Sequence, residues 1–279
     1  MHPTYKFPKL YHDLQALDID LQKQGFSLDE QFGLRLTGDF PHYHVTPLDL
    51  IPFGDIGMDG IHYGFLTDFG TVQNLDDAFI VLISPMDFGD AHKIVARNFR
   101  EFLNLAWTMR GATDLANVHG KQTKEEYFEL FKYFEDSVAE SDTNFEESRA
   151  HVLKCMQQKL VVQPVDDVFD YIENEVRAAR AQQIVLKTQD GIGIVGGEQQ
   201  EGSAPRNFPV TQDDPIDPEQ LAAFLEVSSK KAKLALIRDV QFTGHFTFYS
   251  EFDEVIPGIL EEHGLEYELK MYREIRSMG

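Results

Sequence analysis

The hydrophobic positions of the first 120 residues change their spacing along the chain. Leucines recur every three or four residues over 10–24, and this spacing predicts an amphipathic helix. Residues 61–69 and 79–84 are instead runs of β-branched and aromatic side chains, which are typical of strands. A further short strand is expected at 92–97. The helical spacing returns at 98–109, so the pattern predicts a sheet that is followed by a helix.

Residues 46–109 are therefore expected to form one unit of sheet and helix with a common core. The strands at 61–69 and 79–84 must then lie in the same sheet, with the helix at 98–109 packed on it. The side chains expected in this core are Phe65, Ile80, Leu82, Phe99, Phe102 and Leu103.

The middle of the chain has the pattern of consecutive helices. Thr123 with Glu126, and Thr143 with Glu146, have the spacing of capping boxes, in which each side chain bonds a free backbone N–H of the first helical turn. A third helix is expected to begin near Pro164, since proline suits the first position of a helix.

A β-hairpin is predicted at 184–195, with Asp190 and Gly191 in its turn. The glycines of this segment also match G-x-G-x-x-G, the fingerprint of dinucleotide binding. That function requires the glycines to open a helix, whereas Ile192, Ile194 and Val195 are strand residues. The hairpin is the favoured interpretation, and we expect no nucleotide at these glycines.

The last part of the chain is predicted to mix helices with short strands. Helices are expected at 217–229 and 253–263, with Pro257 in the first turn of the second or kinking it. Strands are expected at 234–240, 245–249 and 265–272.

The predicted fold is α+β: a bent, mainly antiparallel sheet with flanking helices, then a helical segment, then a small α+β part. The predicted boundaries are 1–120, 121–181 and 182–279. With 279 residues, of which 42% are hydrophobic, the chain is long enough for a sizeable core and too apolar for a disordered protein.

Several classes of protein are disfavoured by composition. There is no apolar run long enough to span a membrane and no apolar segment of a signal peptide near the N-terminus, so we expect a cytoplasmic protein that does not bind membranes. Cys155 is the only cysteine, which excludes an intrachain disulfide and a cysteine-based zinc site.

The strong negative charge bears on the choice of partner. The net charge is −22, and the acidic excess is spread along the chain. Such a surface repels phosphate backbones, which argues against direct nucleic-acid binding, and it attracts a basic protein. Solubility alone is an equally open interpretation of this charge.

No catalytic, cofactor or metal motif stands out. The segment that begins at Asp55 faintly resembles a calcium loop but lacks the oxygen ligands that such a loop needs at its third and twelfth positions. His42 and His44 would face one side of a strand and could share a metal with His62, although a polar loop is the favoured interpretation. No nucleophile motif is present, so we expect no cofactor and no enzymatic activity.

The stretch from Thr46 to Met109 resembles the SUKH superfamily, a group of α+β domains best known as bacterial immunity proteins. Its "IPFGDIGMDGIHYGFL" is similar to that family's strand–turn–strand, "FIVLISPMDFGD" to its next strand, and "IVARNFREFLNL" to its closing helix. The family's Asn-Gly-Gly-like segment is not found in residues 25–45. The resemblance implies a bent antiparallel sheet and a function in binding protein partners, often secreted nuclease toxins.

Two hypotheses follow. The first is a non-catalytic module that binds a basic protein, such as a toxin domain, through a loop edge carrying Asp55, Asp59, Asp87 and Asp90, which flank predicted strand ends. The alternative is an enzyme or small-ligand-binding protein whose pocket lies between the N-terminal and C-terminal parts. The sequence leaves the oligomeric state open.

Overall fold

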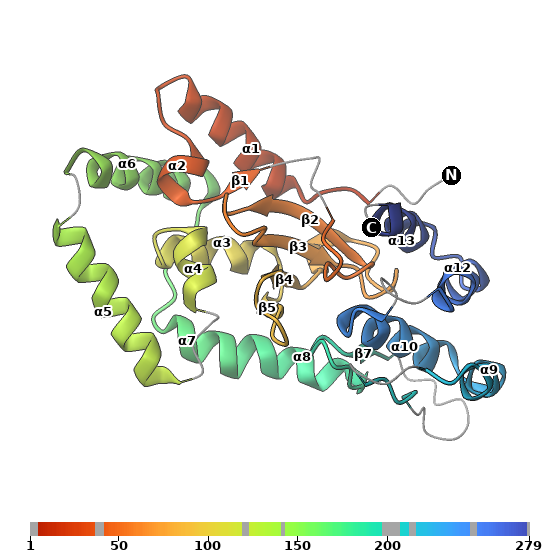
Figure 1. The fold of residues 1–279 in the computed structure, drawn as a ribbon. Coiled ribbons are helices and arrows are strands. Elements are labelled where there is room, and N and C mark those ends of the chain that lie inside the picture. The colour runs from red at the N-terminus through yellow and green to blue at the C-terminus, as the bar shows by residue number, and fades with distance from the viewer. Residues whose placement is uncertain are drawn as a thin grey trace.

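A five-stranded antiparallel sheet forms the centre of the computed structural model, with its strands in chain order (Figure 1). The structure describes residues 5–36, 42–118, 123–140, 143–196, 207–211, 216–245 and 250–277. The strands are β1 (Arg35–Leu36), β2 (Leu50–Asp55), β3 (His62–Leu66), β4 (Ile80–Ile83) and β5 (His92–Ala96). The two strands expected at 61–69 and 79–84 are neighbours, with Phe65 opposite Ile80. That prediction is confirmed, as is the α+β class.

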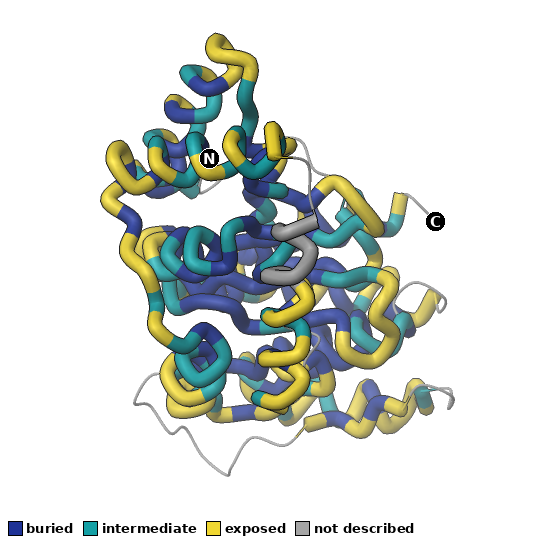
Figure 2. The backbone as a smooth tube through the Cα atoms, turned by 90° about the vertical axis from the view of Figure 1, so that its left-hand side faces the viewer, coloured by how far each residue is buried: buried dark blue, intermediate teal, exposed yellow. Residues whose placement is uncertain are grey.

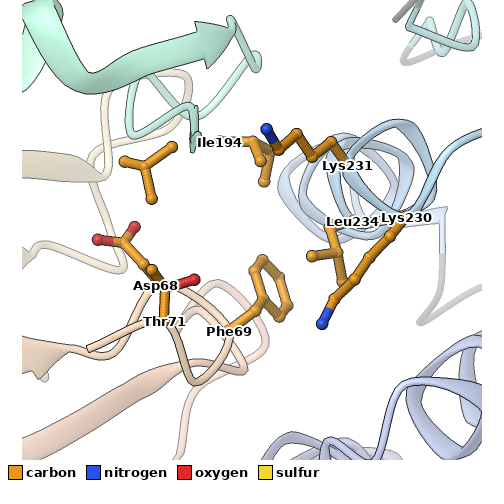
Figure 3. A pocket seen from close by; sticks show the side chains of 8 residues that line it. Asp68, Phe69, Thr71, Ile194, Lys230, Lys231 and Leu234 are labelled. Carbon is orange, nitrogen blue, oxygen red and sulfur yellow. The ribbon is translucent and has the colours of Figure 1, made fainter. Parts of the chain in front are cut away.

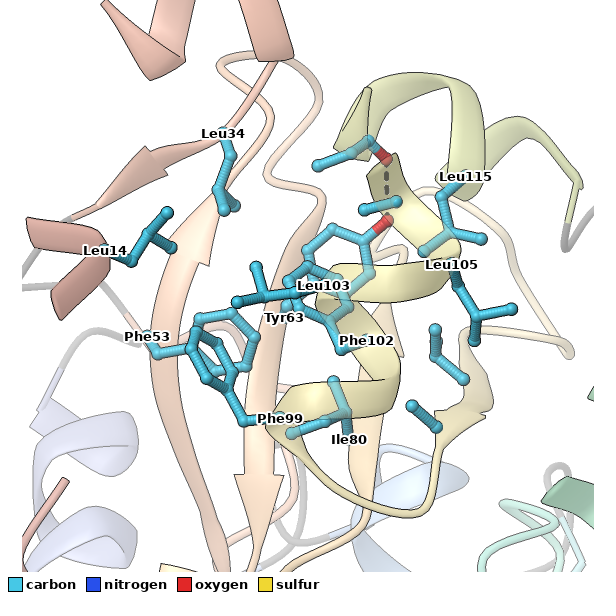
Figure 4. Close-up of a cluster of buried hydrophobic side chains, with 14 of the residues drawn as sticks. Leu14, Leu34, Phe53, Tyr63, Ile80, Phe99, Phe102, Leu103, Leu105 and Leu115 are labelled. Atoms are coloured by element: carbon cyan, nitrogen blue, oxygen red, sulfur yellow. Dashed lines mark hydrogen bonds between the residues drawn. The ribbon is translucent and has the colours of Figure 1, made fainter. Parts of the chain in front are cut away.

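The N-terminal helices cover one face of the sheet. These helices are α1 (Lys9–Gln22), α2 (Leu28–Phe32), α3 (Phe99–Thr108) and α4 (Ala112–Val118), and α6 (Thr143–Leu160) packs against α1 and α2. The core between α3 and the sheet is aromatic, with the ring of Phe53 in edge-to-face contact with those of Phe99 and Phe102 (Figure 4). The six side chains expected in this core are all buried. At the far end of this core, the Tyr63 hydroxyl donates to the Ala112 carbonyl at 2.8 Å.

The opposite face of the sheet packs against the second half of the chain. A long helical segment crosses it, made of α7 (Val168–Tyr171), a π-helical turn η2 (Ile172–Arg177) and α8 (Ala178–Gln183). The predicted hairpin follows as β6 (Ile184–Leu186) and β7 (Ile194–Val195). Val81 and Ile94 of the sheet join Val176 and Ile192 in one buried cluster. Because both faces are covered, the strands are continuous apolar runs without polar alternation.

The helices expected in the middle and at the start of the last part are present. They are α5 (Lys124–Glu140), α6 and α9 (Pro218–Val227), and the connection from β3 to β4 contains a short 3-10 turn, η1 (Leu75–Asp77). The Thr123 hydroxyl caps α5 as expected, by accepting from the Glu126 N–H at 3.2 Å. The second box is not formed in this way, since Thr143 lies inside α6 and Glu146 pairs with Arg110.

Two predicted strands are helices. Residues 234–240 lie in α10 (Lys230–Phe242), and residues 265–272 lie mostly in α13 (Glu266–Ser277). The expected strand at 245–249 falls outside the described residues except for His245. The helix α12 (Phe252–Glu262) is present, with Pro257 in its interior rather than in its first turn.

Besides the cluster around Val81 and Val176, two larger apolar clusters cross the predicted part boundaries. The larger draws side chains from Tyr11 to Ile172, and the second joins Leu48 and Phe69 to the C-terminal helices. The buried residues gather around the sheet and the exposed ones on the outer helices (Figure 2). Within the described part of the chain, no helix combines the length and apolarity needed to cross a membrane.

Candidate functional site

The four predicted binding residues come together at one end of the sheet. Asp55 pairs with His62, His62 with Ile83, and Ile83 with His92, so these residues form one row across β2 to β5. The turns 56–61 and 84–91 both leave the sheet from this row. We call these two turns the acidic turn pair.

Asp55 has a structural role. Its carboxylate is only 4% exposed and accepts from the Arg35 guanidinium at 2.6 and 3.2 Å. It also accepts from the Gly57 N–H at 2.8 Å. The side chain therefore fixes β1 against β2 and shapes the first turn, so any contact with a partner has to be made by its neighbours.

The other three aspartates are exposed. Asp59 lies in the first turn with a left-handed backbone, and Asp87 lies in the second. Asp90 forms an ion pair with Lys93. Asp59 and Asp87 thus face solvent from neighbouring turns, and the charge of Asp87 also acts on the Lys93 ammonium.

The first turn packs against Tyr43 and His62. Gly60 has φ of +68°, and a Cβ atom there would meet the Tyr43 ring at 2.4 Å, so the turn requires glycine. The Gly60 carbonyl lies 2.7 Å from Nδ1 of His62, whose Nε2 lies 3.2 Å from the Thr46 hydroxyl. This arrangement displays Asp59 on a fixed scaffold.

The sequence analysis did not identify three apolar side chains of the acidic turn pair as candidate binding residues. Met58 is 51% exposed, Met86 65% and Phe88 85%. The available signal was a repeated Met-Asp dipeptide in both turns and a phenylalanine directly before Gly89. Large apolar side chains that are exposed together in neighbouring turns suit contact with a partner.

The histidines do not form the metal site considered from the sequence. His42 is half-buried and His44 exposed, while both ring nitrogens of His62 already face hydrogen-bonding oxygens. Burial lowers the pKa of His62 to about 4. In the described ranges, no group of three His, Cys, Asp or Glu side chains is placed to hold a metal.

Buried ion pairs join the sheet to the second half of the chain. Arg180 of α8 binds both oxygens of Asp68, at 2.8 and 2.6 Å. Arg238 of α10 contacts Asp49 at 2.7 Å and Asp190 at 3.3 Å. All five side chains are nearly inaccessible to solvent. They connect the ends of β2 and β3 to the hairpin and α10.

A small cavity of about 170 Å³ opens beside these ion pairs (Figure 3). Asp68 and Phe69, both with left-handed backbones, form one wall, and Ile194 lies on the hairpin side. Lys230 and Lys231 reach it from the start of α10. Both carboxylate oxygens of Asp68, which lines the cavity, accept hydrogen bonds from Arg180.

Two further buried carboxyls lie nearby in the C-terminal half. Burial raises the pKa of Asp239 to about 6, although its carboxylate accepts from the Gln189 N–H at 2.7 Å. Burial likewise raises the pKa of Glu268 to about 7. Neither side chain lines the cavity, so they do not form an acid–base pair there.

Comparison with known proteins adds no further constraint. No family model matches the chain, and a search of the curated proteins finds no match. The resemblance of residues 46–109 to the SUKH superfamily therefore stays a prediction from the sequence.

Proposed function

We propose that this chain is a non-catalytic module that binds a basic protein, in the manner of an immunity protein bound to a toxin domain. The observation that carries the proposal is the acidic turn pair, where Asp59 and Asp87 are displayed from neighbouring turns of a rigid sheet. The resemblance to SUKH domains supports the same class of function.

Charge favours this kind of encounter. A net charge of −22 attracts a cationic surface over a distance, and Asp59 and Asp87 concentrate negative charge where the contact would form. Rim charges act mainly on the association rate, and salt screens their effect. Binding is therefore expected to weaken as the salt concentration rises, chiefly because association slows.

The test begins with the full chain as bait in a lysate of its source organism, at low and at high salt. A captured protein is then identified, purified and measured by surface plasmon resonance. Asp59→Asn with Asp87→Asn is expected to slow association severalfold. The control is Asp76→Asn with Asp77→Asn, which removes the same charge from exposed positions of η1 at the opposite end of the sheet.

Equal effects of the two double variants would contradict a role for the acidic turn pair, since only overall charge would then matter. Failure to retain any protein at either salt concentration would count against the proposed function as a whole.

The cavity favours a second candidate function, the binding of a small anion between the two halves of the chain. Lys230 and Lys231 supply positive charge there, while Phe69 and Ile194 supply apolar walls. Phosphate and citrate are suitable probes, measured by isothermal titration calorimetry. Lys230→Gln with Lys231→Gln should abolish any binding, and Lys154→Gln on α6 should not. This function would replace the first if an anion bound stoichiometrically and no protein partner were found.

A further inference from the structure

Three exposed apolar side chains lie together in the acidic turn pair. Nine large hydrophobic side chains are exposed among the described residues, and three of them, Met58, Met86 and Phe88, lie in these two turns. The other six are dispersed over helices, the hairpin and the connection after α6. Exposed apolar side chains that gather at one place mark an interaction surface.

Acidic residues alternate with these apolar side chains. Met58 precedes Asp59, Met86 precedes Asp87, and Phe88 follows Asp87 directly. The surface therefore presents apolar contacts with carboxylates between them. Its complement has an apolar stripe flanked by cations, which is the character of a basic amphipathic helix.

Spacing agrees with a helix. The two turns join β2 to β3 and β4 to β5, so their centres are about 10 Å apart, or two strand spacings. Side chains seven positions apart on one face of a helix are separated by about 10 Å along its axis. One apolar face can thus contact both turns. Methionine side chains adapt readily to such a partner because they are flexible and polarisable.

A strand is a poorer fit for this surface. The backbone of each turn is bonded internally: the Ile61 N–H donates to Met58 and the Asp87 N–H to Ser84. A partner strand adds to an extended sheet edge with a row of free N–H and C=O groups, whereas these two segments are tight turns.

We propose that the acidic turn pair binds a basic amphipathic helix of the partner, with Phe88 and the two methionines against its apolar face and Asp59 and Asp87 against its cations. This inference rests on the proposed function and specifies the partner at the same surface. Charge then governs encounter, while the apolar contacts govern how long the complex lasts.

The experiment uses two synthetic peptides of lysine and leucine with the same length, composition and charge. In one, the leucines fall on a single helical face; in the other, they are distributed evenly around the helix. Affinity for the full chain is measured by fluorescence anisotropy. The amphipathic peptide is expected to bind at least about tenfold more tightly, as expected for burial of one large apolar side chain.

Phe88→Ser is expected to remove this preference, and Met86→Ser to reduce it. Phe128→Ser on α5 and Val227→Ser on α9 are matched controls, because they remove exposed apolar side chains elsewhere. Circular dichroism establishes that each variant is folded. The controls should keep the preference of the unmodified chain.

Equal binding of the two peptides, or a preference that survives Phe88→Ser with Met86→Ser, would overturn the inference. If Asp59→Asn with Asp87→Asn still lowered the affinity for both peptides, the acidic surface of the proposed function would be supported without the preference for an amphipathic helix. If binding were insensitive to these aspartates as well, the proposed function would fail together with the inference.

Discussion

The ion pair between Arg180 and Asp68 allows a sharp test of how the two halves of the chain are joined. Arg180→Met removes the guanidinium but keeps an apolar side chain of similar length. Asp68 is then left buried without its partner, and the Ile192 carbonyl loses a donor at 3.0 Å. Breaking a buried pair from one side costs about 3–5 kcal/mol, so we expect a loss of that size in the free energy of unfolding.

A double variant separates the charge from the packing. Asp68→Asn removes the negative charge, and asparagine tolerates the left-handed backbone at this position, where φ is +50°. Arg180→Met with Asp68→Asn should therefore lose less stability than Arg180→Met alone, about 1–3 kcal/mol for the polar groups that stay unsatisfied. Lys9→Met is the control, because its ion pair with Asp13 is largely exposed and contributes less than about 1 kcal/mol.

Urea unfolding followed by two signals measures these energies. Trp107, the only tryptophan, lies on α3 beside the N-terminal core and reports on that core by fluorescence, while circular dichroism reports on all helices. The two transitions should coincide in the unmodified chain and separate in Arg180→Met, as the C-terminal half loosens first. If the double variant lost the sum of the two single losses, the pair would not couple the halves as described.

Three further changes should have measurable effects. Gly191→Val should lower the free energy of unfolding by about 1–2 kcal/mol in the urea assay. Gly191 has φ of +73° and open space around it, so the cost is backbone strain alone. Gly258→Ala, in a helix, is the control and should be neutral or stabilising. Glu268 holds a proton in the folded state between pH 4.5 and about 7 that it lacks when unfolded, so it makes stability fall with rising pH by up to about 1.4 kcal/mol per pH unit. Glu268→Gln should abolish this contribution, and a pH-independent difference from the unmodified chain would show the assignment to be wrong. Tyr63→Phe leaves the Ala112 carbonyl without its donor and should cost about 1–2 kcal/mol; an unchanged urea midpoint would mean that this bond contributes nothing net.

The N-terminal sheet was predictable because its elements have distinct local patterns. The strands from 61–69 and 79–84 are short β-branched and aromatic runs, and α3 has a clear apolar face. The pattern of β2 was harder to recognise as a strand, because Pro52 and Gly54 interrupt it and its pairing with β3 shifts register between them. Pairing with neighbouring strands, rather than the local sequence, determines its conformation.

The prediction of the C-terminal helices α10 and α13 as strands failed for two different reasons. Every residue from Leu234 to Gln241 in α10 is buried, including the polar Arg238 and Asp239. This stretch therefore lacks the exposed polar face that identifies an amphipathic helix, and it could not be distinguished from a strand by its pattern. In α13, polar and apolar residues alternate from Glu266 to Met271, but the buried positions, among them Glu268, Tyr272 and Ile275, follow the helical period. Packing among helices, which the local pattern does not encode, made the difference.

The candidate site was predictable only in its location. Four aspartates near predicted strand ends indicated a loop edge at one end of the sheet, but the sequence could not show that Asp55 is buried against Arg35, twenty positions away. Nor could it show that Met58 and Phe88 face solvent, because apolar residues between strands are ordinarily assigned to a core.

The π-helical turn between α7 and α8 affects how this region responds to deletions. A π-helical turn holds about one more residue than an α-helical turn, and η2 (Ile172–Arg177) lies directly before α8, which carries Arg180. Deleting one residue from η2 would therefore restore a regular α-helical turn without rotating the helix that follows, and Arg180 would still face Asp68. A deletion in the regular helix α10 has no such turn to absorb it and would rotate Arg238 by about 100° relative to the start of that helix. The loss of one residue should therefore be tolerated better at η2 than in α10.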